Sequence, residues 1–98
     1  MNSKFLLGKV VMTSGIASEI EHNPKFSNFV KTALGKYSRC DWGDTCKEDA
    51  EMNDLSIRGV TEGRLLAVYD FPDDGNLTIW IITEWDHSCT TILFPWEY

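Results

Sequence analysis

The C-terminal third of this 98-residue chain contains three apolar runs rich in β-branched residues, with very little sequence between them. The runs cover residues 64–71, 77–85 and 89–94. They are separated by two turn-forming segments, residues 72–76 (PDDGN) and 86–88 (DHS). Connections this short join antiparallel neighbours, because a parallel crossover needs about a dozen residues or more. The sequence therefore predicts an antiparallel meander.

The middle run of the three is apolar at consecutive positions, from Ile79 to Ile82, and not only at alternate ones. A strand that is apolar on both sides is typical of a sheet with both faces covered. We therefore expect this strand to be at least partly covered on each face. A further strand is predicted near the N-terminus, over residues 5–12.

Two helices are predicted between the N-terminal strand and the meander. Asn23–Pro24 supplies an N-cap followed by proline at the first helical position, which predicts a helix over residues 24–39. Its apolar residues recur at helical spacing: Phe26, Phe29, Val30, Ala33, Leu34 and Tyr37. A second helix is expected over residues 46–58, because Thr45 and Glu48 match the capping-box pattern.

The predicted order β-α-α-β-β-β indicates an α+β fold, with both helices packed on the C-terminal meander. The length suits a single domain, residues 1–98. No run approaches the ~20 apolar residues of a membrane span. The first residues also lack the apolar centre of a secretory leader. We therefore expect a cytoplasmic protein that does not bind membranes.

Charge is divided unevenly along the chain, whose net value is −6. Residues 1–40 contain six Lys or Arg and two Glu, a net charge of +4. Residues 41–98 contain three Lys or Arg and thirteen Asp or Glu, a net charge of −10. The densest stretch has six acids against Lys47 alone: Asp41, Asp44, Glu48, Asp49, Glu51 and Asp54. Such a stretch either keeps the protein soluble or binds a basic surface of a partner protein. It disfavours direct binding to nucleic acid, whose phosphates repel it.

Trp42 lies inside this acidic stretch and has two interpretations. Folded under the loop, its ring would form a small core with its neighbours. Exposed among the acids, it would be an anchor for an arginine-rich partner surface. On the second interpretation, the predicted partner-binding residues are Trp42 and the six acids.

Cys40 and Cys46 flank the acidic loop, and His87 and Cys89 lie at the turn before the last strand. Three sulfurs and one imidazole nitrogen form a ligand set that suits a structural, tetrahedral Zn²⁺. The five residues between Cys40 and Cys46 exceed the usual spacing, so free thiols are an equal alternative and a disulfide is a further one. His22 is a spare imidazole that could replace His87.

An enzymatic interpretation rests on Asp41, Asp44, Glu48 and Asp49, which could hold Mg²⁺ for hydrolysis. The sequence has no glycine-rich phosphate-binding loop and no nucleophile elbow. We therefore expect a protein that is not an enzyme, and a metal-dependent hydrolase is the last of the alternatives.

Several blocks of the sequence resemble a group of small proteins from bacterial plasmids, phages and other mobile elements. The blocks are DWGD (41–44), Glu48-Asp49, Asn53-Asp54, Arg64-Leu65-Leu66 and the ending WIITEWDHSCTTILFPWEY (80–98). The pattern of the group reads GDWGD, ED, ND and an ending similar to ITEADRSVTTILFPEEY. The resemblance covers about two thirds of the chain. It implies a fold but no function, because the group has no settled activity.

This chain departs from the pattern at two places. The glycine before DWGD is Cys40 here, and DRSV is replaced by residues 86–89, DHSC. A small acidic protein of this origin also resembles the phage-encoded anti-CRISPR proteins, some of which inhibit Cas9. This second resemblance implies an interaction protein that inhibits a host nucleic-acid-handling protein, with Cas9 as the best candidate. The alternative is a regulatory or housekeeping protein of a mobile element that binds another partner.

Overall fold

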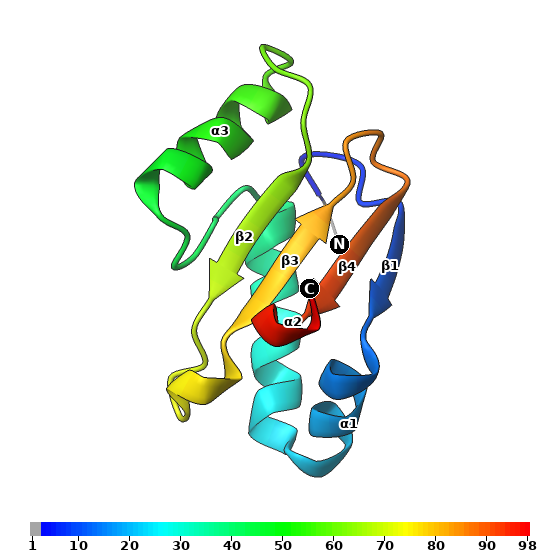
Figure 1. The fold of residues 1–98 in the computed structure, drawn as a ribbon, viewed down its shortest axis with the longest axis vertical. Helices are drawn as coiled ribbons and strands as arrows, with labels where there is room; N and C mark the ends of the chain where they lie inside the picture. The colour runs from blue at the N-terminus through cyan, green and yellow to red at the C-terminus, as the bar shows by residue number, and fades with distance from the viewer. Residues whose placement is uncertain (1–2) are drawn as a thin grey trace.

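The computed structural model describes residues 3–98 and has the predicted α+β fold (Figure 1). In chain order the elements are β1 (Lys9–Met12), α1 (Ser14–His22), α2 (Pro24–Ser38), α3 (Lys47–Ile57), β2 (Leu65–Tyr69), β3 (Ile79–Thr83) and β4 (Cys89–Leu93). Two short 3₁₀ turns, Gly75–Leu77 and Pro95–Glu97, lie in the connections and near the C-terminus. The predicted positions of α2, α3 and the last three strands are confirmed.

The strands of the described chain form one sheet with the order β1-β4-β3-β2. β2, β3 and β4 pair antiparallel, which confirms the meander, and β1 lies parallel to β4. A parallel neighbour needs a long connection, and here that connection runs from α1 to β3. Figure 1 shows β1 and β2 as the two outer strands, with α2 behind the sheet and α3 beside β2.

The core lies between α2 and the sheet. Successive residues of a strand point to opposite faces, and the buried side chains that face α2 alternate accordingly: Leu65, Ala67, Tyr69, Ile79, Ile81, Thr83, Thr90 and Ile92. From α2, Phe26, Val30, Ala33 and Tyr37 pack against them. The predicted apolar stripe of this helix is therefore confirmed as a core-facing stripe.

The face of the sheet away from α2 is partly covered, as the apolar middle strand predicted. Ile82 is 6% exposed and Trp80 is half-buried. The Tyr98 ring lies 5.7 Å from the Trp80 ring, and the Arg64 guanidinium lies 5.1 Å from the centre of the Tyr98 ring. Tyr98 thus contributes to covering β3 on its second side.

A chain of hydroxyl groups crosses the core. The hydroxyls of Tyr37 and Thr83 lie 2.7 Å apart, as do those of Thr83 and Thr90. The Thr90 hydroxyl donates to the carbonyl of Leu7 at 2.6 Å. Burial raises the pKa of Tyr37 above its ordinary value. Because each buried hydroxyl has a partner, the hydrogen bonds offset the cost of burying these groups, and the chain joins α2, β3, β4 and the N-terminal segment.

Thr90→Val keeps the side-chain shape but removes a hydroxyl from this chain. It leaves the Thr83 hydroxyl and the Leu7 carbonyl short of a partner, and an unsatisfied buried group costs about 1–3 kcal/mol. We expect the free energy of unfolding in urea to fall by about 2 kcal/mol. The control Thr91→Val, on the opposite face of β4, should change it by less than ~0.5 kcal/mol. Equal effects of the two variants would contradict the buried chain.

The helix α1 was not predicted from the sequence. Its apolar residues toward the core are the buried Ile16 and, one turn later, the half-buried Ile20. Its start is held by Glu97, whose carboxylate accepts hydrogen bonds from the Thr13 hydroxyl and the Gly15 amide. Burial alone would raise the pKa of Glu97, but these bonds, with one from the Phe94 amide, lower it. α1 is therefore stabilised by a long-range contact that no local pattern reveals.

β1 is shorter than the strand predicted over residues 5–12, because the chain bends at Gly8. Gly8 has a φ of +66°, and a Cβ there would lie 2.4 Å from the backbone carbonyl of His87. Only glycine combines the left-handed conformation with so close an approach. Before the bend, Phe5 packs edge-on against Tyr37, with ring centroids 5.5 Å apart.

α3 differs from the prediction in its place and in its start. It packs against the outer strand β2 and not on the face that α2 covers (Figure 1). Its N-cap is Cys46, whose side chain makes no capping bond, and not Thr45. The Thr45 hydroxyl instead donates to the Trp42 carbonyl and accepts from the Val68 amide. The capping-box prediction is therefore wrong, because an amide of β2 takes the hydroxyl.

Candidate functional site

The segment 41–54 closes the outer edge of β2. An edge strand presents unpaired amides and carbonyls that can pair with another chain. Val68 donates its amide to the Thr45 hydroxyl at 2.9 Å and accepts the Asp44 amide on its carbonyl at 2.8 Å. Two residues further on, the Asp70 amide donates to the Asp44 carboxylate at 2.9 Å. Asp44 and Thr45 therefore take the place of a neighbouring strand.

Asn53 closes the same edge from within α3. Its side-chain amide donates to the carbonyl of Leu66 at 2.8 Å, and its side-chain oxygen accepts the Leu66 amide at 3.2 Å. Asn53 is 3% exposed and is the buried residue of α3. The helix is thus joined to the sheet by a polar contact, beside Ala50 and Ile57, which are half-buried and pack against the core.

Asn53→Ala removes both of these bonds and leaves the backbone of Leu66 without its partner. Each buried group left unpaired costs about 1–3 kcal/mol, so we expect the free energy of unfolding to fall by about 2–3 kcal/mol. Urea denaturation measures this loss. Asn28→Ala, which removes an exposed amide from α2, is the control and should cost less than ~0.5 kcal/mol. A similar loss in both variants would show that Asn53 does not hold the edge.

Trp42 is buried, and so the expectation of an exposed aromatic anchor is wrong. It is 7% exposed, and its indole N–H donates to the Asp54 carboxylate at 2.8 Å. Its ring lies 5.4 Å from the ring of Tyr37 and 6.2 Å from that of Phe5. The interpretation that Trp42 folds under the loop into a core is confirmed.

Gly43 and Asp41 complete the loop. Gly43 has a φ of +62°, and a Cβ there would lie 2.4 Å from the Tyr69 ring. The Tyr69 hydroxyl donates to the Asp41 carbonyl at 2.7 Å, and the Asp41 carboxylate accepts the Gly43 amide at 3.2 Å. Burial raises the pKa of Tyr69, and the Asp41 carboxylate adds to the rise. Every residue of the DWGD and Asn53-Asp54 blocks therefore holds the loop or α3 in place.

The six acids of the segment 41–54 are all exposed, and together we call them the acidic surface: Asp41, Asp44, Glu48, Asp49, Glu51 and Asp54. Among residues 3–98 the one ion pair joins Lys25 to Asp73 at 3.8 Å, so it involves none of these acids. Glu48, Asp49 and Glu51 also extend from α3 without a side-chain hydrogen bond to the described chain. The negative charge of this surface is therefore available to a partner.

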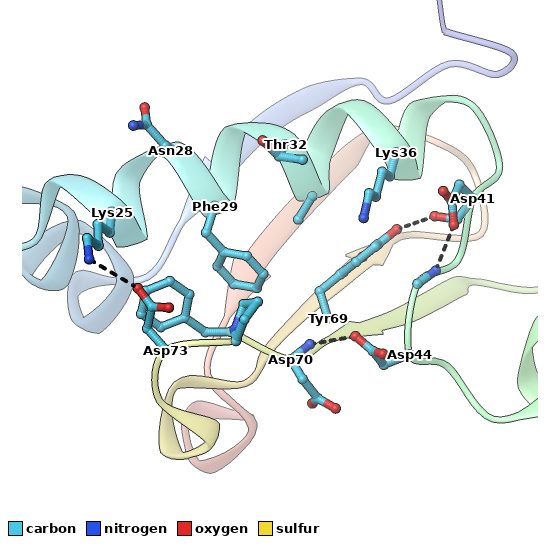
Figure 2. A pocket seen from close by; sticks show the side chains of 14 residues that line it. Lys25, Asn28, Phe29, Thr32, Lys36, Asp41, Asp44, Tyr69, Asp70 and Asp73 are labelled. Atoms are coloured by element: carbon cyan, nitrogen blue, oxygen red, sulfur yellow. Dashed lines mark hydrogen bonds and ion pairs between the residues drawn. The ribbon is translucent and has the colours of Figure 1, made fainter.

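A groove of about 860 Å³ adjoins the acidic surface (Figure 2). It lies between α2 on one side and, on the other, the loop that follows α2 and residues 69–73 at the end of β2. Its charged lining residues are Lys25, Lys36, Asp41, Asp44, Asp70 and Asp73. Figure 2 shows the lysines on α2 across from the aspartates, with the Lys25–Asp73 ion pair at one end. The remaining aspartates outnumber Lys36, so the groove extends the negative charge of the acidic surface toward α2.

The four carboxylates considered for Mg²⁺ lie on two separate elements. Asp41 and Asp44 line the groove, while Glu48 and Asp49 belong to the first turn of α3. Within residues 3–98, no three His, Cys, Asp or Glu side chains form a group that could hold a metal ion.

The four residues predicted to bind zinc lie at three places in the fold. Cys40 follows α2, Cys46 precedes α3, and His87 and Cys89 belong to the β3–β4 turn and the start of β4. All three cysteines are free thiols. They belong to no metal-holding group of the described residues, and zinc binding stays a prediction from the sequence.

The imidazoles and Cys89 make other contacts. His87 Nδ1 lies 2.8 Å from the Leu6 carbonyl, and His22 Nδ1 lies 2.7 Å from the Ser18 carbonyl. Cys89 shares a face of β4 with Thr91, whose hydroxyl lies 3.8 Å from the sulfur. Because Thr90 points toward α2, Cys89 points away from it, and so away from Cys40 at the end of that helix.

Cys40 has a structural position that the sequence did not reveal. Its φ is +64°, the left-handed conformation that ends many helices. The Cys40 amide donates to the Tyr37 carbonyl and the Asp41 amide donates to the Lys36 carbonyl, which satisfies the last turn of α2. Glycine is favoured at such a position because a Cβ strains it.

Cys40→Gly should therefore stabilise the protein. Relief of the left-handed strain is worth about 1–2 kcal/mol, and loss of the half-buried side chain offsets part of it. We expect the free energy of unfolding to rise by about 0.5–1 kcal/mol. The exposed control Cys46→Ala removes a side chain that makes no capping bond and should leave it unchanged. A zinc site at these cysteines predicts the opposite sign, because metal binding then contributes to folding. Elemental analysis of protein purified without chelator completes the test.

Comparison of this chain with protein-family models, with curated proteins and with solved structures found no match. In the described part of the chain, no helix is both long and apolar enough to cross a membrane.

Proposed function

We propose that this chain is a non-enzymatic interaction protein that binds a basic surface of a partner protein through its acidic surface. The observation that carries the proposal is an exposed set of acids, without ion pairs in the described chain, on a segment fixed to β2. A charge array that is already ordered loses little conformational entropy on binding. It also accelerates the encounter with a basic partner.

Glu48, Asp49 and Glu51 are the acids that we expect to contact the partner. They extend from α3 and hold no other part of the fold. The other three acids of the surface accept hydrogen bonds that keep the loop and α3 in place. Substituting those three would disturb the fold and the binding together, so they are poor probes of function.

Met52 supplies the apolar contact that the buried Trp42 cannot. It is 53% exposed on α3, three residues after Asp49 and four after Glu48, and so it lies on the same side of the helix as those acids. Charge gives fast association but seldom gives tight binding, whereas a desolvated apolar anchor slows dissociation. Methionine also adapts well to irregular partner surfaces.

The partner that we propose is a host protein that handles nucleic acid, with Cas9 as the best candidate. Such proteins hold phosphates in positively charged channels, and an acidic surface competes for the same positive charge. The resemblance to proteins of mobile elements and to anti-CRISPR proteins supports this choice and a site of action in the cytoplasm of a bacterial host. The second candidate, a regulatory or housekeeping protein of a mobile element, would bind another basic partner through the same surface.

The proposal is tested with two matched double variants. Glu48→Lys with Glu51→Lys changes the acidic surface, and Glu21→Lys with Glu84→Lys makes the same change of charge at exposed positions elsewhere. The first variant should slow association with the Cas9–guide RNA complex at least about tenfold and restore DNA cleavage. The control should stay within about threefold of the wild type.

Two further measurements separate the partner from the mechanism. The association rate of the wild type should fall steeply as added salt shortens the Debye length below ~8 Å. Met52→Ala should raise the dissociation rate about tenfold. Wild-type protein that leaves cleavage by several Cas9 orthologues untouched at large excess rejects Cas9 as the partner. Binding to any partner that is insensitive to salt rejects the acidic surface.

A further inference from the structure

The two edges of the sheet differ. The β2 edge is closed by segment 41–54, whereas no strand of the described chain pairs with the outer edge of β1. The amides of Lys9 and Thr13 donate to carbonyls of the β4 side, each at 3.1 Å. Because alternate residues of a strand direct their amides and carbonyls to opposite edges, those of Val10 and Met12 point away from the sheet. This edge is therefore open to another strand.

The side chains along this edge are apolar. Val10 is 41% exposed and Met12 is 45% exposed. Edge strands that must stay unpaired usually carry proline, inward-pointing charges or a covering segment. β1 has only Lys9 as a charge and has no proline. The open backbone groups specify an extended strand as the occupant, and the exposed side chains specify an apolar one.

We propose that the occupant is β1 of a second copy of this chain, paired antiparallel about a two-fold axis at Val11. In this register Val10 lies opposite Met12 of the second copy and exchanges two hydrogen bonds with it, and the symmetric pair does the same. Every outward amide and carbonyl of β1 is then paired. The exposed apolar side chains of the two copies cover one another.

Electrostatics favour this register. Lys9 lies two residues from the axis, so the two Lys9 side chains start about 13 Å apart along the strands, beyond the Debye length of ~8 Å. A two-fold axis at Val10 would halve that separation and place Met12 opposite Gly8. The acidic surface lies beside β2, at the other side of the sheet from β1 (Figure 1). The two acidic surfaces of the dimer therefore lie at its opposite ends, where they repel least.

The inference is independent of the proposed function, because it uses a different edge and its test needs the purified protein alone. A four-residue strand pair buries less than the ~1,600 Å² of a standard interface, so the dimer is weak. We expect a dissociation constant on the order of 100 µM. The dimer would present two acidic surfaces, which raises avidity for any partner that has repeated binding sites.

Sedimentation velocity over a range from ~10 µM to ~1 mM tests the dimer. The apparent mass of the wild type should rise toward twice the monomer mass. Val10→Lys with Met12→Lys should abolish the rise, because it sets lysine opposite lysine twice. Met52→Lys with Val60→Lys, which changes the same residue types at exposed positions near α3, should leave it intact. A wild type that stays monomeric throughout overturns the proposal.

Disulfide trapping tests the register in a background whose three native cysteines are alanine. Val11→Cys faces its own copy across the axis in a non-hydrogen-bonded pair, where Cα atoms lie about 4.5 Å apart and a disulfide can form. In the same register the two Val10 positions lie more than ~7 Å apart, so Val10→Cys should cross-link at least about tenfold more slowly. Equal cross-linking, or none with Val11→Cys, overturns the register. Retained melting temperatures show that the variants are folded.

Discussion

The closure of one edge of the sheet determines how the rest of this molecule is arranged. The outward amides and carbonyls of β2 need partners, and Asp44, Thr45 and Asn53 supply them in place of a strand. To reach those groups the loop must turn tightly at Gly43 and bury Trp42 beneath it. α3 then lies beside the sheet and not on its face. Its position is set by these directional hydrogen bonds, together with Ala50 and Ile57, which are half-buried and pack against the core.

This division of roles changes how the acidic segment is understood. A dense run of acids suggests that all of its members serve one purpose, but half of them accept hydrogen bonds that hold the segment in place. The others, on α3, carry unpaired charge and flank Met52. A rigid support with a free outer surface is the arrangement that preorganised binding requires. The DWGD and Asn53-Asp54 blocks belong to the support, and the acids without a structural role lie at other positions.

Periodicity made much of the fold predictable, because the stripe of α2 and the runs of β2, β3 and β4 each reflect burial against a large core. What could not be predicted depends on contacts between distant residues. The start of α1 is held by Glu97, which is far away in the sequence. The Thr45 hydroxyl accepts the Val68 amide and therefore does not cap α3. The sequence correctly predicted that the acids on α3 are exposed. Trp42 is buried although its neighbours in the sequence are acidic and suggest an exposed position. Cys40 has a left-handed φ because α2 ends there. The sequence did not reveal this backbone role, and its thiol suggested a metal ligand.

The contrast between the two edges of the sheet is the central claim, and amide hydrogen exchange measured by NMR in dilute protein tests it most directly. At ~10 µM, where the β1 edge is unpaired, the amides of Leu66 and Val68 should be protected at least about a thousandfold relative to a free peptide. Those of Val10 and Met12 should exchange within about tenfold of the free-peptide rate. Exchange at Leu66 and Val68 as fast as at Val10 and Met12 would contradict the account, because the segment 41–54 would then not close the edge of β2.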